Sequence, residues 1–269
     1  MIFLKTIQKI QSNNISTIFP FSVPIIKSLL KLELKADVTI LIGENGSGKS
    51  TFLEGLACSI GSISVGDQSL QSDPTLFHAR LLSETIKLGW NEKTRKGFFM
   101  RAEDFFQYTK KMNAMKAELE EEIVRVDREF KNRSKTAQLY ARSGFAGQSA
   151  AIENRYGKDL DAHSHGEAFI DFFSSRFVPG GIYLLDEPEA PLSPLRQISF
   201  LMMIKEMVEN NSQFIIATHS PIIMAYPGAS IISFDGTEIE EIPYEQISSV
   251  KLMKNFLNYP ESYLQHLND

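Results

Sequence analysis

The chain has very little cysteine. Its 269 residues include a single one, Cys58, which excludes an internal disulfide framework and suits a reducing compartment. It also lacks any uninterrupted apolar run of the ~18–20 residues that a membrane helix needs. Its first residues show neither the apolar segment nor the cleavage site of a signal peptide. We therefore expect a cytoplasmic protein that makes no membrane contact of its own.

The chain as a whole also has no excess of basic over acidic residues. The net charge of −5 argues against nucleic-acid binding by the chain as a whole. The charge is uneven, however, because residues 87–142 hold 14 Lys and Arg against 9 Asp and Glu, a net charge of +5. The rest of the chain holds 14 against 24, a net charge of −10. The middle segment is therefore expected to be a separate unit.

The remaining sequence alternates short apolar runs with helical patterns. Strands are expected at Val38–Ile42, Ile182–Leu185 and Gln213–Thr218, and helices at 50–60, 166–177 and 195–209. This alternation predicts an α/β fold in which a mostly parallel sheet carries helices on both faces. Two antiparallel hairpins are also expected, one from residues 85–90 and 97–101 and a closing one from 230–234 and 238–242.

Residues 102–133 read as one long amphipathic helix. Its apolar residues are spaced by three or four and form one stripe of Met112, Met115, Leu119, Ile123, Val126 and Phe130. Packing against the domain or a second helix explains such a stripe, and a partner surface is the alternative. Residues 134–161 are polar and contain glycine, so a mobile connection is expected there. The resulting division is an N-terminal lobe (1–101), an inserted helical subdomain with its connection (102–161) and a C-terminal lobe (162–269).

A glycine-rich segment follows the first of these buried strands. Gly43-Glu-Asn-Gly-Ser-Gly-Lys-Ser-Thr51 matches the phosphate-loop pattern G-x-x-x-x-G-K-[ST] in full. Its glycines let backbone N–H groups turn inward, and the following helix offers its positive N-terminus to the same anion. Lys49 is expected to neutralise the β- and γ-phosphates of a nucleotide, and the Ser50 hydroxyl to ligate Mg²⁺. The nucleotide-binding set is Asn45, Gly46, Ser47, Gly48, Lys49, Ser50 and Thr51.

A strand that ends in two acidic residues completes this expected site. The apolar strand from Ile182 carries Asp186 to its carboxyl end, where open α/β sheets bind ligands. Asp186 is expected to hold Mg²⁺ opposite Ser50, and Glu187 to polarise the attacking water.

Three motifs follow one another along the chain. They are the phosphate loop, Leu-Leu-Asp-Glu-Pro-Glu-Ala at 184–190 and Ala-Thr-His-Ser-Pro at 217–221. In this order they resemble the ABC ATPase superfamily, in its soluble branch of chromosome-maintenance and recombination-repair ATPases. More narrowly, the chain resembles short bacterial predicted ATPases of this type. The resemblance implies that His219 is the switch histidine that contacts the γ-phosphate. It also implies that Ser164 and Gly166 are signature residues that grip the nucleotide of a second subunit, in a head-to-tail homodimer formed upon ATP binding.

The chain departs from the family at several places. His165 replaces the first glycine of the transporter signature, and the segment 192–194 lacks the usual aspartate of the D-loop. No glutamine stands where the Q-loop falls, so Arg101 or Glu103 is the expected replacement. Phe19 or Phe21 lies at a suitable distance before Lys49 to stack on adenine, although core packing is the commoner role of phenylalanine.

These features predict Mg²⁺-dependent ATP hydrolysis, with Glu187, His219 and Lys49 as the catalytic residues. ATP would close the dimer and hydrolysis would release it, as a regulatory, nucleic-acid-related or defence-related switch. An unknown protein or nucleic acid is the expected partner of residues 87–142. The alternatives are the nucleotide-binding subunit of an ABC transporter and a module that binds ATP and barely hydrolyses it.

Overall fold

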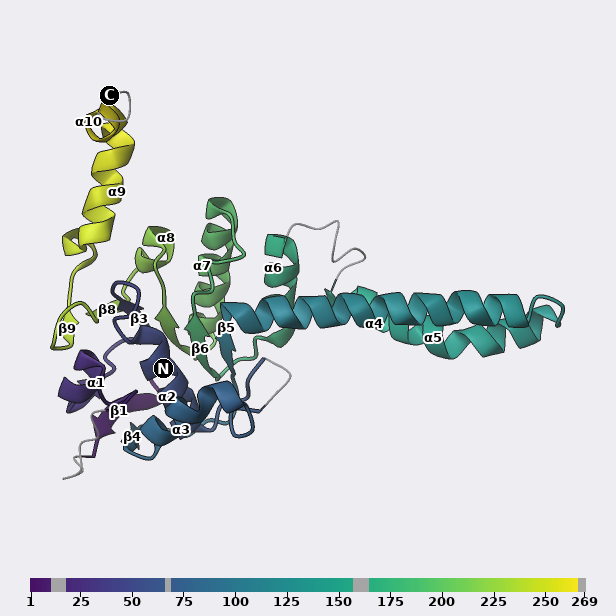
Figure 1. Ribbon diagram of the computed structural model, residues 1–269, viewed down its shortest axis with the longest axis horizontal. Coiled ribbons are helices and arrows are strands. Elements are labelled where there is room, and N and C mark those ends of the chain that lie inside the picture. Colours follow the sequence, from purple (N-terminus) through teal and green to yellow (C-terminus); the bar gives the residue numbers. More distant parts are fainter. Residues whose placement is uncertain (11–17, 66–68, 157–164, 266–269) are drawn as a thin grey trace.

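The computed structural model describes residues 1–10, 18–65, 69–156 and 165–265. The chain forms a body of strands and helices from which one long helical hairpin projects (Figure 1). Among the described residues, no helix combines the length and the apolar character that crossing a bilayer requires. The α/β fold class predicted from the sequence is confirmed.

The body is built on a six-stranded sheet with the order β5-β6-β7-β3-β8-β9. All neighbouring strands are parallel except β8 and β9, which form the expected closing hairpin. Three central strands, β3 (Val38–Ile42), β6 (Ile182–Asp186) and β7 (Gln213–Ala217), are buried along their whole length. The others are β5 (Phe99–Arg101), β8 (Ser230–Ser233) and β9 (Glu240–Glu241). Because the central strands are parallel, their carboxyl ends meet at one edge of the sheet.

One face of this sheet packs against a smaller antiparallel sheet and α2 (Lys49–Ile60). The smaller sheet has the order β2 (Lys31–Glu33), β1 (Leu4–Lys9), β4 (Ile86–Trp90). The short helices of this part of the body are α1 (Pro24–Ser28), η1 (Pro74–Leu76) and α3 (Phe77–Ser83).

The opposite face packs against α6 (His165–Arg176), α7 (Pro194–Glu209) and α8 (Pro221–Met224). This core is rich in aromatic rings, and Phe169, Phe173 and Phe200 contact one another at centroid distances of 4.6 to 5.9 Å. The two cores fix the central sheet from both sides, as a parallel sheet requires.

The hairpin expected from residues 85–101 is wrong. β4 pairs antiparallel with β1 in the smaller sheet, whereas β5 pairs parallel with β6 in the larger one. Both segments have strand-like sequences, but their partners lie far away along the chain, and no local pattern reports such pairing.

The projecting hairpin consists of α4 (Ala102–Glu129) and α5 (Lys135–Tyr156), which we call the arm. At 1.5 Å per residue, the 28 residues of α4 span about 42 Å. The predicted apolar stripe of α4 is at least partly buried at every position except Met115, which is 40% exposed. Helix α4 packs against α5, which is the second helix that such a stripe predicts.

The mobile connection expected over residues 134–161 is wrong for its larger part, because α5 occupies Lys135–Tyr156. Residues 157–161 lie outside the described residues. The small residues Ala137, Ala141 and Ser149, at spacings of four and eight, lie on the less exposed side of α5. Such a helix draws its stability from packing on its neighbour rather than from a strong apolar stripe of its own.

The described chain ends in η2 (Tyr244–Gln246), α9 (Ser248–Asn258) and α10 (Pro260–Leu264). Helices α9 and α10 extend away from the body beside α8 and α7 (Figure 1), and Val250 is the buried residue of α9.

We predict that Gly97→Ala and Gly144→Ala, the same chemical change, have opposite effects on stability. Gly97 has φ +107°, and a Cβ atom there would lie 1.9 Å from the carbonyl oxygen of Ile182. Its replacement should lower the free energy of unfolding by more than about 2 kcal/mol. Gly144 lies in α5 with open space around its Cα, so alanine should raise stability by about 0.5–1 kcal/mol. Urea unfolding measures both, and equal stabilities for Gly97→Ala and the wild type would contradict the close approach of β5 and β6.

Candidate functional site

Residues 43–48 join β3 to α2 at the sheet edge, and Lys49, Ser50 and Thr51 form the first turn of α2. Gly48 immediately precedes α2 in a left-handed conformation, with φ +102°. A Cβ atom at Gly48 would lie 2.7 Å from Cγ1 of Val23, so only glycine fits there. No side chain caps the start of α2, which leaves the amides of its first turn available to an anion.

Lys49 is the first residue of α2 and is only 4% exposed. Its Nζ donates to the carbonyl oxygens of Gly43 at 2.6 Å and Glu44 at 3.0 Å. Burial lowers the pKa of Lys49, and the nearby carboxylates of Asp186 and Glu187 oppose this shift. The loop therefore holds a cation at its centre at low dielectric, where a phosphate would interact with it strongly.

Ser50 and Asp186 lie together although they are far apart along the chain. The Ser50 hydroxyl donates to Oδ1 of Asp186 across 3.2 Å. Burial raises the pKa of Asp186 to about 7, and the charges of Glu187 and Glu54 add to this effect. The hydrogen bond from Ser50 and the charge of Lys49 act in the opposite direction.

Glu187 and His219 face each other at the same edge. Glu187 has φ +51°, in the left-handed region that non-glycine residues seldom adopt. Its amide donates to the carbonyl of Ala217 at 2.9 Å, which anchors the turn after β6 to the end of β7. Nε2 of His219 lies 3.7 Å from Oε1 of Glu187. Both side chains are partly exposed, so solvent reaches this pair.

Glu189 lies beside the candidate site, and the sequence assigned no role to it. Its Oε1 accepts hydrogen bonds from the backbone amides of His219 at 2.7 Å and Ser220 at 3.1 Å. Its Oε2 is buried with no hydrogen-bond partner in the described part of the chain. Glu189 thus holds the loop that carries His219 against the segment after β6. The signal was a second glutamate two residues after Glu187, but the sequence does not show what it binds.

Asp235 is a second residue that sequence reasoning missed. Its Oδ1 accepts from the backbone amide of Glu44 at 2.7 Å and so fixes the start of the phosphate loop.

The other predicted residues have mixed outcomes. Asn45, Gly46 and Ser47 form the phosphate loop, and Thr51 lies in the first turn of α2. Gly166 lies in the first turn of α6. Ser164 lies outside the described residues. Its predicted role and that of Gly166 stay predictions.

Arg101 stands opposite Asp186 in the register of β5 and β6. Its guanidinium group forms ion pairs with the carboxylates of Glu54, Asp73, Glu103 and Asp104, at distances of 2.8 to 3.5 Å. Burial works against its charge, but the hydrogen bond and charge of Asp104 raise the pKa of Arg101 above its ordinary value. Arg101 therefore joins the sheet edge to the base of α4, because these acids come from α2, α4 and the segment before η1.

The two phenylalanines proposed to stack on adenine differ in their surroundings. Phe19 is 51% exposed and its ring lies 4.9 Å from that of His78. Phe21 packs partly against the core beneath the smaller sheet. Both precede Val23, which contacts the phosphate loop at Gly48.

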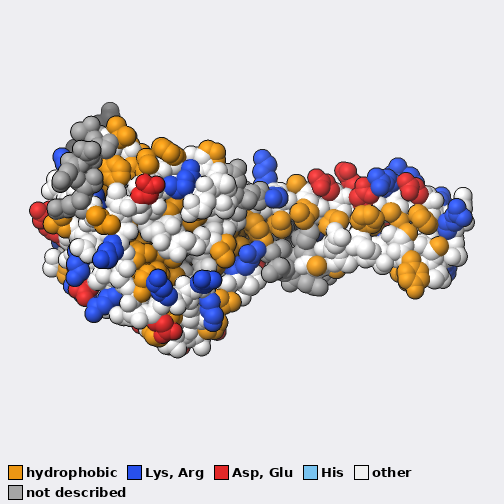
Figure 2. Space-filling model, turned by 90° about the horizontal axis from the view of Figure 1, so that it is seen from below, with side chains coloured by type: hydrophobic (Ala, Val, Ile, Leu, Met, Phe, Trp, Pro, Cys, Tyr) orange, Lys and Arg blue, Asp and Glu red, His pale blue; other side chains and the backbone are white. Residues whose placement is uncertain are grey.

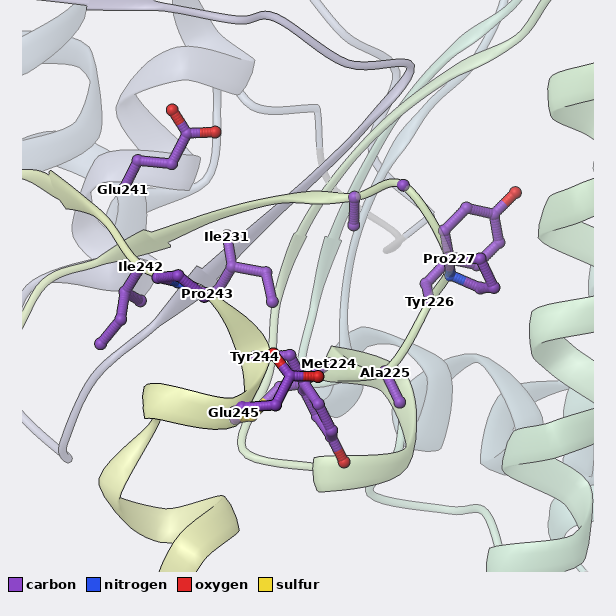
Figure 3. A pocket seen from close by; sticks show the side chains of 12 residues that line it. Met224, Ala225, Tyr226, Pro227, Ile231, Glu241, Ile242, Pro243, Tyr244 and Glu245 are labelled. Carbon is purple, nitrogen blue, oxygen red and sulfur yellow. The ribbon is translucent and has the colours of Figure 1, made fainter.

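Two hollows lie near the end of the described chain. One, of about 870 Å³, is a mostly apolar groove between α7, α8 and α9 that begins at Glu189 and His219. The other, of about 550 Å³, runs from Tyr226 to Glu241 and Glu245 (Figure 3). Glu241 is already engaged, by Lys35 at 2.8 Å and Ser230 at 2.8 Å. The second hollow contains none of the predicted site residues, so the candidate site is the phosphate-loop edge.

The residues at this edge fit a magnesium ion. Among the described residues, no group of three or more His, Cys, Asp or Glu could enclose a metal. Mg²⁺ is seldom held by an all-protein cage, because it keeps several waters and binds one or two protein oxygens together with substrate phosphates. The paired oxygens of Ser50 and Asp186 are donors of this kind.

Comparison with known proteins agrees with this geometry. The family described as "AAA domain, putative AbiEii toxin, Type IV TA system" matches residues 168–225. This stretch runs from α6 through Asp186 and Glu187 to His219 and α8. No curated protein matches the chain significantly.

Several solved structures are similar at low identity. One is an Smc head domain from Pyrococcus furiosus, with an extended coiled coil and bound to the C-terminal domain of ScpA. It is 13% identical, covers 95% of this chain and 100% of its own, and has a TM-score of 0.46. Another is cbiO1 from Clostridium perfringens, part of the ABC transporter complex cbiONQ, with 15% identity, 99% coverage of each chain and a TM-score of 0.43. A third is an ATP-binding cassette of an ABC transporter in its ADP conformation, with 14% identity, 100% coverage of each chain and a TM-score of 0.44.

The phosphate loop after β3, the acidic end of β6 and the histidine after β7 together form the arrangement expected of an ATPase-type P-loop domain. The family match covers the second and third of these elements.

We predict that Asp186→Asn stabilises the metal-free protein, increasingly so as the pH rises. The pKa of Asp186 is about 7 in the folded protein and 3.8 is its ordinary value. Between these values the unfolded chain binds fewer protons, so wild-type stability falls as the pH rises. The penalty is on the order of a few kcal/mol above pH 7, and asparagine removes it.

Urea unfolding in EDTA at about pH 5 and pH 8 tests this difference. Asp171→Asn, at an exposed position of α6, is the matched control and should show no such trend. A gain for Asp186→Asn that is the same at both pH values would show that the buried carboxylate does not titrate as described.

Proposed function

We propose that the protein hydrolyses ATP to ADP and phosphate in a Mg²⁺-dependent reaction. The observation that carries this proposal is the pairing of Ser50 with Asp186 at 3.2 Å, which joins the phosphate loop to the acidic end of β6. The buried ammonium group of Lys49 lies in the same loop. A triphosphate bound there would meet a cation, a helix N-terminus and a pair of oxygens suited to Mg²⁺.

The roles of the residues follow from this arrangement. Lys49 and the loop amides stabilise the charge that develops on the transferred phosphoryl group. Glu187 orients the attacking water and accepts its proton as the bond from water oxygen to the γ-phosphorus forms. The bond between the γ-phosphorus and the bridging oxygen breaks, and ADP leaves with the electron pair. His219, beside Glu187, contacts the γ-phosphate. When bound, Mg²⁺ supplies charge neutralisation for the β- and γ-phosphates, and Ser50 and Asp186 would hold it.

The same proposal includes an ATP-gated homodimer. In this arrangement Ser164 and Gly166 of a second copy complete the site opposite the phosphate loop. The position of Gly166 in the first turn of α6 supports an anion contact there, since helix N-termini attract negative charge. ATP binding then favours the closed dimer and hydrolysis releases it, as in a regulatory, nucleic-acid-related or defence-related switch. The single, buried cysteine suits the reducing cytoplasm in which we place this switch.

We predict that Glu187→Gln lowers kcat for ATP hydrolysis by at least about 100-fold, because the amide cannot accept the proton of the water. ATP binding should persist, since Lys49 and the loop are unchanged. Phosphate release measures kcat and nucleotide titration measures the affinity. The matched control, Glu92→Gln, alters an exposed residue of the loop after β4 and should leave both unchanged.

Light scattering of the Glu187→Gln protein, with and without Mg-ATP, tests the dimer separately. ATP should convert monomer to dimer, and Ser164→Arg should prevent this by occupying the interface. A protein that stays monomeric at saturating ATP would refute the composite site while leaving the hydrolysis proposal intact. A Glu187→Gln protein with wild-type kcat would refute the role of Glu187 itself.

We predict that Glu189→Ala lowers kcat roughly ten- to hundredfold with little change in KM for ATP, because the loop carrying His219 loses its tether. Glu189→Gln retains an acceptor oxygen for the two amides and should restore most of the rate. Steady-state kinetics of the two variants separates this positioning role from a merely structural one. If both variants had equally low kcat, the tether would not be the cause.

A further inference from the structure

The free end of the arm, which we define as residues 124–142, is a basic surface that lies far from the phosphate loop. It holds six Lys and Arg against two acids, a net charge of +4. Figure 2 shows blue side chains at this end, while red ones gather between it and the body. The segment 117–122 carries four glutamates and no basic residue. Lys110, Lys111 and Lys116 lie nearer the body, and the acidic segment separates them from the basic tip.

Most of the basic side chains at the tip are unengaged. The two acids are occupied, since Asp127 lies 3.6 Å from Arg142 and Glu129 lies 3.8 Å from Arg125. The remaining four cations are exposed and have no acidic partner among the residues that the structure describes. They are Arg128, Lys131, Arg133 and Lys135.

These four cations surround the turn between α4 and α5. Arg128 belongs to the last turn of α4, Lys135 opens α5, and the other two lie in the connection between the helices. Like charges in so short a segment repel one another, and an anion with several charges relieves that repulsion.

An aromatic face stands beside the cations. Tyr140, in the second turn of α5, is 77% exposed, and its neighbour Leu139 is 68% exposed. Helix α4 covers neither of them, so they add nothing to the packing of the arm. An exposed ring next to unpaired cations suits a ligand that has both phosphates and flat bases.

We propose that the tip of the arm binds single-stranded nucleic acid, with Arg128, Lys131, Arg133 and Lys135 contacting phosphates and Tyr140 stacking on a base. The acidic segment 117–122 and the negative body repel the same polyanion, so the contact is limited to the tip. An acidic protein segment would satisfy the cations but would leave the aromatic face unused. The inference goes beyond ATP hydrolysis and does not require it.

The number of phosphate contacts predicts the dependence on salt. Four contacts to a single strand give a slope of log affinity against log salt of about −2.8, or roughly 50-fold weaker binding between about 50 and 200 mM salt. With two contacts the slope is about −1.4, or roughly sevenfold over the same range.

The experiment is fluorescence anisotropy with the full chain, without nucleotide, and a labelled DNA strand of about 20 nucleotides and its RNA counterpart. The double variant Arg133→Glu/Lys135→Glu should bind more than about tenfold more weakly, and its salt dependence should fall to roughly sevenfold. Tyr140→Ala should lose at least about fivefold in affinity with no change in the salt slope. The matched control, Lys93→Glu/Arg95→Glu, makes the same change of charge in an exposed loop of the body and should bind as the wild type does.

Three results would overturn the proposal. The first is that the tip variant binds the strand as tightly as the wild type does. The second is that the body control weakens binding as much as the tip variant does. The third is that a polyglutamate peptide binds the wild type as tightly as the strand does, which would make the tip a site for acidic protein. ATP hydrolysis is measured on the same samples. The tip variant should keep the wild-type rate, so a failure of the nucleic-acid contact is distinguishable from a failure of the ATPase.

Discussion

The parallel pairing of β3, β6 and β7 is the constraint on which the rest of the structure depends. In this register Leu41 and Asp186 both lie opposite Ala217, so the three strands end at the same level. The phosphate loop, the acidic pair and the histidine loop each follow one of these ends. Residues from segments far apart in sequence thereby come within a few ångströms of one another. The strand register places these loops approximately, and hydrogen bonds such as those of Glu189 fix their positions.

The sequence was sufficient where a pattern is local. A buried apolar strand followed by a complete phosphate-loop motif gave β3, the loop and α2, and an apolar run ending in acids gave β6 and Asp186. It was insufficient where the outcome depends on a distant partner. β4 and β5 look like a hairpin until β1 and β6 are seen to pair with them. α5 looks like a polar linker because it packs against α4 and most of its stability is expected to come from that packing.

The site residues divide in the same way. Some of them belong to contiguous motifs, so their chemistry can be predicted from the sequence alone. These are Lys49, Ser50, Asp186, Glu187 and His219. Glu189 and Asp235 act through backbone amides of another loop, and every residue type except proline can supply such an amide. The surroundings of Arg101 were equally hidden, because its four acidic partners come from three separate segments. Contacts of this kind leave no sequence signature, so only the folded chain reveals them.

The arm begins where the sheet ends, since Arg101 is both the last residue of β5 and the residue before α4. A rigid helix about 42 Å long that is fixed at one end behaves as a lever. A tilt of about 10° at its base would carry the far end through about 7 Å, roughly the spacing of one nucleotide in an extended strand. Displacements too small to disturb the packing around Arg101 would thus be large at the tip. The longer the arm, the larger the movement of its tip for a given tilt at its base.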